Sequence, residues 1–353
     1  MKRVLIDCRL SRTASGIGRY TRELVTELLK TAEMHFMLLV RSRHEEWLKT
    51  LPKGSRTIVE ADIPHYSIRE QLMLPWMLRS ERVDLLFSPH FNVPLFCPVP
   101  FVATIHDLIL HRYPNEASKL KQIAYRMVVG SCIRRARALI AVSNFTAREI
   151  EELYGADARR KTTVIHEGVE FESPSKETIA TVLRKFNLWK PYFLYVGNAK
   201  QHKNVPLLLR AFSKLEDPSK ELVLVCGGKE TKNLRLPRGV RGIASVSDQD
   251  LPALYASALA FVTPSLYEGF CLPVLEAEAV GCPVIAVGTT AIPEVAPPGS
   301  RLIEPTVEAL TATLKNPPRH HESRKRFLWK DAAQKTVALL HEVAGSARHG
   351  EER

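Results

Sequence analysis

The chain has 353 residues, of which 45% are hydrophobic and 25% charged; this composition is that of a globular protein and excludes a disordered or fibrous chain. The length suits two domains that each bury a core. With 50 basic and 38 acidic side chains the net charge is +12, which favours anionic partners such as nucleotide phosphates, nucleic acid or an acidic membrane surface. No RNP, KH, zinc-finger or helix-turn-helix signature is present, so we expect no nucleic-acid partner.

Neither a membrane span nor a signal peptide is expected. The longest apolar runs fall well short of the roughly 20 residues that cross a bilayer. Residues 1–7 have too few apolar positions for a signal peptide and predict a first β-strand instead. Six cysteines are scattered without a CxxC pair, mostly in apolar segments, which predicts reduced thiols. The expected location is therefore the cytoplasm.

Along the chain, short β-branched runs alternate with stretches of helical periodicity, the pattern of βαβ units around a parallel sheet. The predicted strands of the first half are 4–7, 36–40, 57–60, 84–87, 101–105, 139–142 and 163–165. Those of the second half are 192–196, 221–226, 240–244, 259–263 and 283–287. The polar stretch 170–177 separates the two series. We predict an α/β protein with domains at 1–168 and 169–326.

A final helix is predicted over 327–345. Its apolar and small residues recur at helical spacing, at Trp329, Ala332, Ala333, Thr336, Val337 and Leu340. Because the aromatic start of this helix needs a surface to pack on, we expect the helix to return to the first domain.

The most informative stretch is 264–279, which follows the predicted strand 259–263. Pro273 suits the first turn of a helix, where its missing N–H costs nothing. Glu276 then lies early in that helix, whereas Glu268 and the amides of 269–272 lie in the loop at the carboxyl end of the strand, the edge at which open α/β sheets bind ligands. Carboxylates can accept hydrogen bonds from the vicinal hydroxyls of a sugar, and helix N-terminal amides suit phosphate. Alternatively, the two acids only complement the helix dipole.

This stretch resembles the E-x7-E signature of glycosyltransferase family 4, the group 1 glycosyltransferases. The resemblance extends over nearly the whole chain, and its further motifs are 15–20 (SGIGRY), 105–108 (IHDL), 141–145 (AVSNF), 197–204, 247–255 and 292–295 (IPEV). Each motif alone is weak evidence for this resemblance, but the order and spacing of the motifs together make the match specific. The resemblance implies a GT-B fold, in which two Rossmann-like domains face each other across a cleft.

The resemblance also implies roles for individual residues. Glu268 would contact the donor hexose, Glu276 the ribose hydroxyls, and Lys203 the diphosphate, where a lysine acts as a point charge. Lys200 either adds a second positive charge or is a solvated loop cation. The chain departs from the family at Asn198 and His202, where an arginine is common. The donor-binding residues are then expected to be Gly16, Gly18, Asn198, Lys200, Lys203, Gly269, Phe270, Cys271, Leu272 and Glu276.

Candidate residues of the first domain also follow strands. Gly16 and Gly18 come after the first strand, where φ freedom and close backbone approach to phosphate are expected. His106 and Asp107 follow the strand 101–105. His106 is expected to be catalytic, either donating to a sugar hydroxyl or polarising the reacting centre, because the family resemblance outweighs its interpretation as a loop histidine. Asp107 either orients the imidazole or caps the next turn. Ser143 and Asn144 are expected to cap a helix that begins near Thr146.

A basic stretch in the first domain has no acidic residue from 120 to 138 and carries Lys119, Lys121, Arg126, Arg134, Arg135 and Arg137. Interleaved apolar residues make it a candidate basic amphipathic helix, which suits an anionic bilayer carrying a lipid-linked acceptor. The alternative is a packed helix with a solvated basic face. If the first interpretation holds, the protein contacts the inner face of the cytoplasmic membrane peripherally.

We therefore expect a retaining glycosyltransferase that moves a hexose from a nucleotide-diphosphate sugar to a saccharide or lipid-linked saccharide. No DxD-type acidic pair or His/Cys cluster is visible, so no cofactor is expected and the enzyme would be metal-independent, with His106, Glu268 and Lys203 as catalytic residues. A resemblance to mannosyltransferases of bacterial surface-polysaccharide assembly, such as lipopolysaccharide, favours GDP-mannose. The alternatives are a UDP-sugar-dependent transferase, a sugar-nucleotide epimerase or a catalytically degenerate scaffold.

Overall fold

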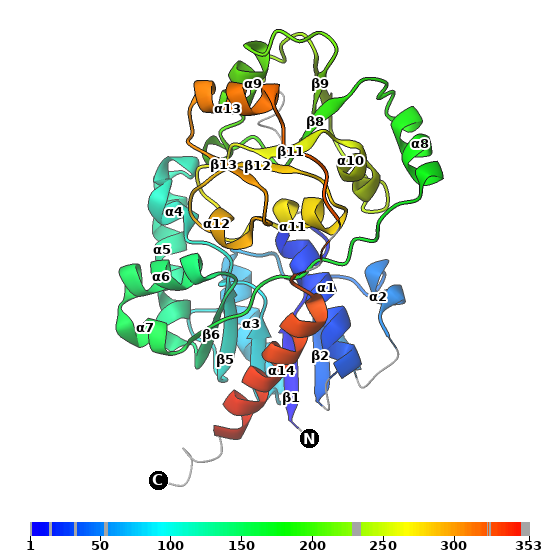
Figure 1. The fold of residues 1–353 in the computed structure, drawn as a ribbon. Helices are drawn as coiled ribbons and strands as arrows, with labels where there is room; N and C mark the ends of the chain where they lie inside the picture. The colour runs from blue at the N-terminus through cyan, green and yellow to red at the C-terminus, as the bar shows by residue number, and fades with distance from the viewer. Residues whose placement is uncertain are drawn as a thin grey trace. The chain divides into compact units, whose positions relative to one another are not determined.

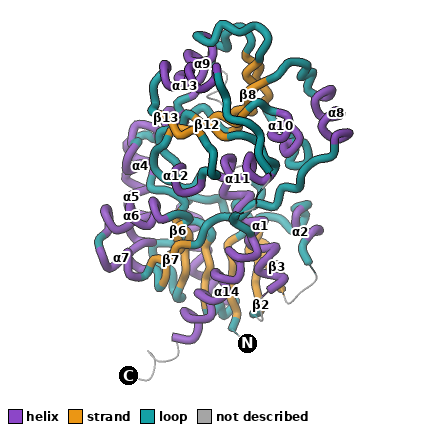
Figure 2. Tube along the Cα trace, in the orientation of Figure 1, coloured by secondary structure: helices purple, strands orange, loops and turns teal. Residues whose placement is uncertain are grey.

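The computed structural model describes residues 2–13, 16–31, 34–52, 56–227, 234–322, 324 and 326–346. The chain divides into two compact units, Met1–Gly168 with Leu328–Arg353 (the first unit) and Val169–Phe327 (the second unit). Each unit is built around one parallel sheet with helices outside it (Figure 1; strands are orange in Figure 2). The predicted α/β class is confirmed.

The first unit holds a seven-stranded sheet in the order β3-β2-β1-β4-β5-β6-β7. All neighbouring strands are parallel, and β1, β4, β5 and β6 are almost fully buried because helices cover both faces of the sheet. The strands are β1 (Arg3–Asp7), β2 (His35–Val40), β3 (Arg56–Glu60), β4 (Leu85–Ser88), β5 (Phe101–Ile105), β6 (Ala138–Ala141) and β7 (Thr162–Val164). Each lies within one residue of its predicted position.

The helices of the first unit lie on the two faces of this sheet. They are α1 (Gly16–Thr31), α2 (Trp47–Thr50), α3 (Ile68–Ser80), α4 (Ile109–Arg112), the 3-10 turn η1 (Pro114–Glu116), α5 (Lys119–Arg135), α6 (Asn144–Tyr154), α7 (Ala156–Arg160) and α14 (Trp329–Ser346). The buried side chains of α3, α5 and α6 form one apolar core with the strands. These three helices therefore cover the same face of the sheet.

The second unit repeats this arrangement with six parallel strands in the order β10-β9-β8-β11-β12-β13. The strands are β8 (Tyr192–Val196), β9 (Glu221–Val225), β10 (Val240–Ile243), β11 (Ala260–Thr263), β12 (Val284–Val287) and β13 (Arg301–Ile303). The helices are α8 (Lys176–Lys185), the 3-10 turn η2 (Gln201–Lys203), α9 (Val205–Ser213), α10 (Leu251–Ser257), α11 (Leu272–Ala279), α12 (Ile292–Val295) and α13 (Val307–Lys315). Only the edge strand β13 was absent from the sequence prediction.

Both sheets reverse their strand order once, between β1 and β4 in the first unit and between β8 and β11 in the second. Chain connections leave in opposite directions on either side of such a switch point, which opens a ligand-binding crevice at the carboxyl ends of the strands. The loops that follow these four strands are therefore the first places to look for a site. Among the described residues, no helix is long and apolar enough to cross a bilayer.

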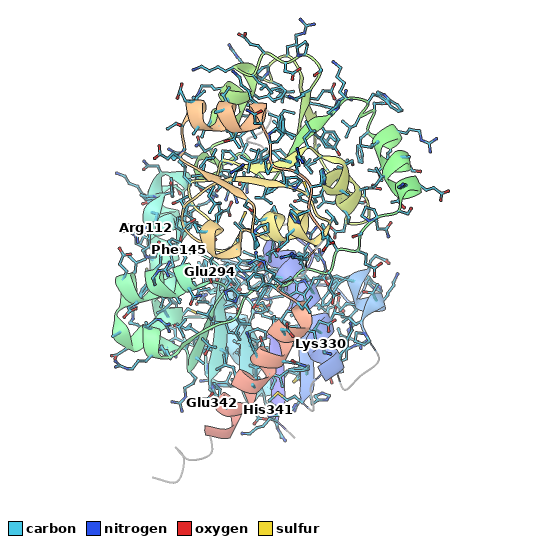
Figure 3. All side chains as sticks on the ribbon, viewed as in Figure 1. Arg112, Phe145, Glu294, Lys330, His341 and Glu342 are labelled. Carbon is cyan, nitrogen blue, oxygen red and sulfur yellow. The ribbon has the colours of Figure 1, made fainter. Side chains whose placement is uncertain are left out.

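The last helix, α14, belongs to the first unit and packs along α1 (Figure 1). Trp329 is 2% exposed at its start, and its ring lies 5.7 Å from that of Tyr20. The chain passes so close to Gly168 that a Cβ there would come within 2.1 Å of the Trp329 backbone nitrogen. Lys330, His341 and Glu342 of the same helix are exposed (Figure 3). Helix α14 is thus fastened to the first unit through its aromatic start.

Replacing Trp329 with alanine is expected to lower the free energy of unfolding by about 3–5 kcal/mol, because the change empties a fully buried aromatic site. The measurement is urea unfolding followed by far-UV circular dichroism. The matched control is Trp189→Ala, because Trp189 is 71% exposed in the second unit. That control should change stability by less than about 0.5 kcal/mol. Equal losses in the two variants would contradict the proposed anchoring.

Candidate functional site

The second unit brings two predicted residues together at its switch point. Lys203 ends η2, which follows β8, and Glu268 lies in the loop after β11, the strand next to β8 in the sheet. Lys203 Nζ lies 2.6 Å from Glu268 Oε1 and 2.8 Å from Oε2. Both side chains are largely buried, at 20% and 11% exposure. A bidentate pair of opposite charges is therefore held in the loops where the fold predicts a ligand.

Backbone hydrogen bonds fix the position of Glu268. Its amide donates to Thr290 Oγ1 at 3.0 Å, and its carbonyl oxygen accepts from the Ala291 amide at 3.3 Å. On the other side, the carbonyl oxygen of the buried His202 accepts from the Leu266 amide at 2.8 Å. The loops after β8, β11 and β12 are thus joined around one carboxylate. The sequence motif 292–295, which forms α12, begins directly after the last of these loops.

Glu276 lies in α11 and is only 3% exposed. Its Oε2 accepts a 2.9 Å hydrogen bond from the hydroxyl of Tyr255, a fully buried residue of α10. This hydrogen bond fixes the direction of the Glu276 carboxyl group. Tyr255 lies within a motif that carries the family resemblance, but nothing in the sequence points to this contact.

The chain between the two glutamates is buried and tightly turned. Gly269, Phe270, Cys271 and Leu272 are all buried, and Cys271 adopts a left-handed conformation (φ 85°) as the N-cap of α11. A cysteine rarely adopts this conformation, so the loop must be held by its surroundings. Burial raises the pKa of the Cys271 thiol well above its usual range, which leaves the thiol protonated and unreactive. Pro273 lies in the first turn of α11, as predicted.

The other predicted residues of this unit shape the loop after β8. Asn198 Oδ1 accepts from the Lys200 amide at 3.1 Å, and the Asn198 carbonyl oxygen accepts from the Tyr195 hydroxyl at 2.6 Å. The Lys200 side chain is exposed, in keeping with either of the two roles considered for it. Asn198 thus contributes to the shape of the loop through its own contacts.

In the first unit, His106 follows β5 and is held on both sides of its ring. Nδ1 lies 3.0 Å from Glu167 Oε1, and Nε2 lies 2.8 Å from the carbonyl oxygen of Pro89. A carbonyl oxygen only accepts, so Nε2 carries the proton that is donated to Pro89, while Nδ1 faces the Glu167 carboxylate. Burial alone lowers the pKa of His106, but the hydrogen bond and the charge of Glu167 outweigh it and raise the pKa above its usual value. To donate to a sugar, Nε2 would have to leave Pro89.

The glycines of the first motif lie in α1, with Gly16 as its first residue. The φ freedom expected of a glycine is not used at Gly18, whose φ is not positive. Gly18 is needed for space, because a Cβ there would lie 2.1 Å from the Thr13 carbonyl oxygen. The space about Gly16 is open. Ser15, which opens this motif, lies outside the described residues.

The capping predictions can also be compared with the structure. Ser143 is the N-cap of α6, and its Oγ accepts from the Thr146 amide at 3.0 Å, so the predicted capping role is confirmed for Ser143. Asn144 is instead the first residue of that helix. Asp107 Oδ1 accepts from the amide of Ile109, the first residue of α4, which matches the capping alternative for Asp107.

At the switch point of the first unit, Arg9 is buried among acids. Its Nη2 lies 2.6 Å from Asp7 Oδ2 and 2.7 Å from Glu70 Oε1. Asp7, Glu70 and His65 are close enough together to hold a metal ion. The Arg9 guanidinium, however, supplies the positive charge for both carboxylates, and an ion would have to displace it. We therefore assign this grouping a structural role.

Comparison with known proteins identifies the family. The Glycosyltransferase Family 4 model matches residues 14–173, and the Glycosyl transferases group 1 model matches residues 181–333. The chain belongs to the family 4 glycosyltransferases. The O-antigen chain mannosyltransferase B of Escherichia coli is 28% identical over 92% of this chain and 95% of its own length. The O-antigen chain mannosyltransferase RfbU of Salmonella typhimurium strain LT2 is 25% identical over 85% and 86%.

The fold agrees with this family. The structure of HepE from Anabaena, in complex with UDP-glucose, matches with a TM-score of 0.70 at 15% identity and covers 99% of this chain and 100% of HepE. The predicted GT-B fold, with its two parallel α/β sheets, is thereby confirmed. In this glycosyltransferase the loops of the candidate site therefore leave the sheets at the switch points of this fold.

Two residues of this glycosyltransferase's candidate site were not predicted from the sequence, Glu167 and Tyr255. No sequence motif gave Glu167 a role, yet its carboxylate binds the ring of His106. The one signal for it is its place two residues after the predicted strand 163–165, at the same edge of the sheet as the loop after 101–105. The Tyr20 ring, 4.6 Å from that of His106, completes this side of the first unit.

Replacing Glu167 with glutamine is expected to lower the pKa of His106, because burial then acts without the opposing carboxylate. In the wild type the raised pKa of His106 stabilises the folded state. This stabilisation is complete at pH values below the unfolded-state pKa of about 6.5, and it disappears as the pH rises through the folded-state pKa of His106. The variant should therefore lose stability chiefly at pH values below the folded-state pKa of the wild type. NMR titration of selectively labelled histidine and unfolding at several pH values measure both effects.

The control is Glu152→Gln, which removes an exposed carboxylate that pairs with Arg112. Its effect on the His106 titration should be negligible. An unchanged His106 pKa in Glu167→Gln would show that the pair is not an imidazolium with a carboxylate.

Proposed function

We propose that this glycosyltransferase transfers a hexose, with mannose from GDP-mannose as the first choice, to a saccharide or lipid-linked saccharide acceptor in surface-polysaccharide assembly. The observation that carries the proposal is the Lys203–Glu268 pair at the switch point of the second unit, close in sequence to the buried carboxylate of Glu276. Two relatives named as O-antigen mannosyltransferases support the choice of sugar and pathway. The six cysteines are free and buried, which suits the cytoplasm.

In the proposed reaction Lys203 exchanges its carboxylate partner for the donor diphosphate. A diphosphate carries more negative charge than one carboxylate and would attract the ammonium strongly in a partly buried site. Glu268, released from Lys203, would then accept hydrogen bonds from the hexose, and Glu276 would accept them from the ribose. Binding of donor is therefore expected to reorganise one ion pair while Thr290 and Ala291 hold the loop in place.

Transfer would proceed on one face of the sugar with retention of configuration. The bond from the anomeric carbon to the phosphate oxygen breaks as the bond to the acceptor oxygen forms, and the acceptor's proton passes to the departing phosphate. Lys203 stabilises the charge that develops there, a contribution that is typically several kcal/mol for a preorganised group. We propose that no metal ion is required, because the lysine supplies this positive charge.

A UDP-sugar is the second candidate donor. HepE, which matches in fold, is in complex with UDP-glucose in its structure, but the likeness at 15% identity concerns the fold. A sugar-nucleotide epimerase or an inactive scaffold would differ from a transferase with either donor, because neither of them would glycosylate an acceptor.

The donor is identified by calorimetric titration of the purified protein with GDP-mannose, UDP-glucose, UDP-galactose and UDP-N-acetylglucosamine. One donor should bind, and Glu276→Ala should weaken it at least about tenfold, because the variant loses charge-assisted hydrogen bonds of roughly 1.5–3 kcal/mol. Slow hydrolysis of the same donor by the wild type would rule out the alternative of a catalytically inactive scaffold. If wild type and variant bind none of the four, the proposal fails.

A subtler change tests the orientation of Glu276. Tyr255→Phe removes one hydroxyl from a buried pair and should weaken donor binding about tenfold, which corresponds to about 1.4 kcal/mol. The control is Tyr192→Phe. The Tyr192 hydroxyl is also buried in the second unit, but it donates to the Leu254 carbonyl oxygen and contacts Ser257 instead of Glu276. Both variants should lose similar thermal stability. Only Tyr255→Phe should change donor affinity; equal affinity in the two variants would rule out a positioning role for Tyr255.

A further inference from the structure

The first unit carries an unusual concentration of exposed apolar side chains. Among the described residues, eight of the eleven exposed large hydrophobic side chains lie between Tyr66 and Met127. Single exposed hydrophobic residues are normal on a protein surface, whereas a contiguous group indicates an interaction site. Seven of the eight lie on two helices and the segment between them, and the eighth, Tyr66, lies two residues before the first of these helices.

Helix α3 contributes one stripe of this group. Ile68, Leu72 and Trp76 follow each other at intervals of four residues, so they lie along one side of the helix, and they are 81%, 69% and 68% exposed. The opposite side of α3 is buried against the sheet through Leu74 and Leu78. Helix α3 is therefore apolar on its outer side as well as its inner side.

Helix α5 contributes a second stripe. Leu120, Ile123 and Met127 have the i, i+3, i+7 spacing of one helix side and are 78%, 57% and 55% exposed. The inner side of α5 is anchored in the same core as α3, through Val129 and Ile133. The two helices thus cover the same face of the sheet and both present apolar residues to solvent.

The segment 89–100 joins the two stripes. The Leu95 amide donates to Gln71 Oε1 of α3 at 2.8 Å, and Arg135 Nη2 of α5 donates to the Cys97 carbonyl oxygen at 3.2 Å. Between these two anchor points lies Phe96, which is 80% exposed. We call the exposed side chains of α3 and α5, with Phe96 between them, the α3–α5 face.

The charges on this face have one sign. The only acid in α3, α5 or the segment 89–100 is Glu70, which is fully buried and paired with Arg9. The exposed charges are all basic, and they belong to Arg69, Arg79, Lys119, Lys121, Arg126, Arg134 and Arg135. Apolar side chains among cations, without exposed acids, are the chemistry of a surface that binds anionic lipid.

From these observations we infer that the α3–α5 face docks on an anionic lipid bilayer, with its apolar side chains in the headgroup region and its cations on lipid phosphates. The inference rests on the proposed function and extends it, since it states how the enzyme reaches a lipid-linked acceptor. Helices α3 and α5 both begin beyond the carboxyl ends of strands, and His106 follows the end of β5 at that same edge. A docked bilayer would therefore border the edge of the first unit where His106 lies.

The test is flotation of the full chain, without donor, on vesicles of phosphatidylcholine alone or with about 30% phosphatidylglycerol. Wild type should float with the anionic vesicles at least about tenfold better than with the neutral ones, and high salt should weaken binding. Leu72→Ser with Trp76→Ser should reduce binding at least about fivefold, as should Lys119→Gln with Lys121→Gln. These four side chains are exposed, so the variants should unfold at the wild-type temperature.

Matched controls lie outside the face. Trp189→Ser replaces a tryptophan of similar exposure in the second unit, and Lys214→Gln with Lys335→Gln removes two exposed lysines elsewhere. All should float like wild type. The inference is overturned if wild type does not bind anionic vesicles, if the controls lose as much as the face variants, or if light scattering shows a dimer that Trp76→Ser dissociates. Donor titration without vesicles stays independent, so failure of docking is distinguishable from failure of the transferase proposal.

Discussion

In each unit the candidate site depends on the same constraint, which is that a charge removed from water must be held by a partner of opposite sign. Lys203 and Glu268 meet this condition in the second unit, and His106 with Glu167 meets it in the first. Removing one member of such a pair costs more than the pair contributes, because the other is left buried and unpaired. Each pair therefore holds its side chains in fixed positions, and such preorganisation is what the proposed catalysis by fixed charges requires.

Each parallel sheet positions the loops that carry one of these pairs, and much of that could be predicted from the sequence. Strands buried on both faces are continuous apolar runs, which made most of the twelve predicted strands easy to place. The partly exposed strands β3, β7 and β10 were placed through their β-branched residues. The missed strand β13 has only three residues, two of them exposed, at the edge of its sheet. A short solvated edge strand has no apolar run or alternation by which it could be recognised. Its existence follows from pairing with β12, a contact that only the fold provides.

The candidate site was predictable where function is encoded locally. Glu268, Pro273 and Glu276 lie within one strand-turn-helix unit, and their order alone indicated the turn, the helix start and the ligand edge. Glu167 and Tyr255 act on residues 61 and 21 positions away, and no local pattern reports such contacts. Gly18 shows a related limit. A glycine can serve a positive φ or a close approach, and the sequence does not distinguish these two uses.

Helix α3 links the surface of the first unit to its interior. While Trp76 faces solvent, Glu70 on the same helix accepts from Asn92 Nδ2 at 2.9 Å as well as from Arg9. Asn92 lies three residues after Pro89, whose carbonyl oxygen binds His106. Helix α3 therefore contacts solvent on one side and, on the other, the segment 89–92 that binds the histidine. The same helix thus belongs both to the exposed apolar surface of the first unit and to the hydrogen-bonded surroundings of His106.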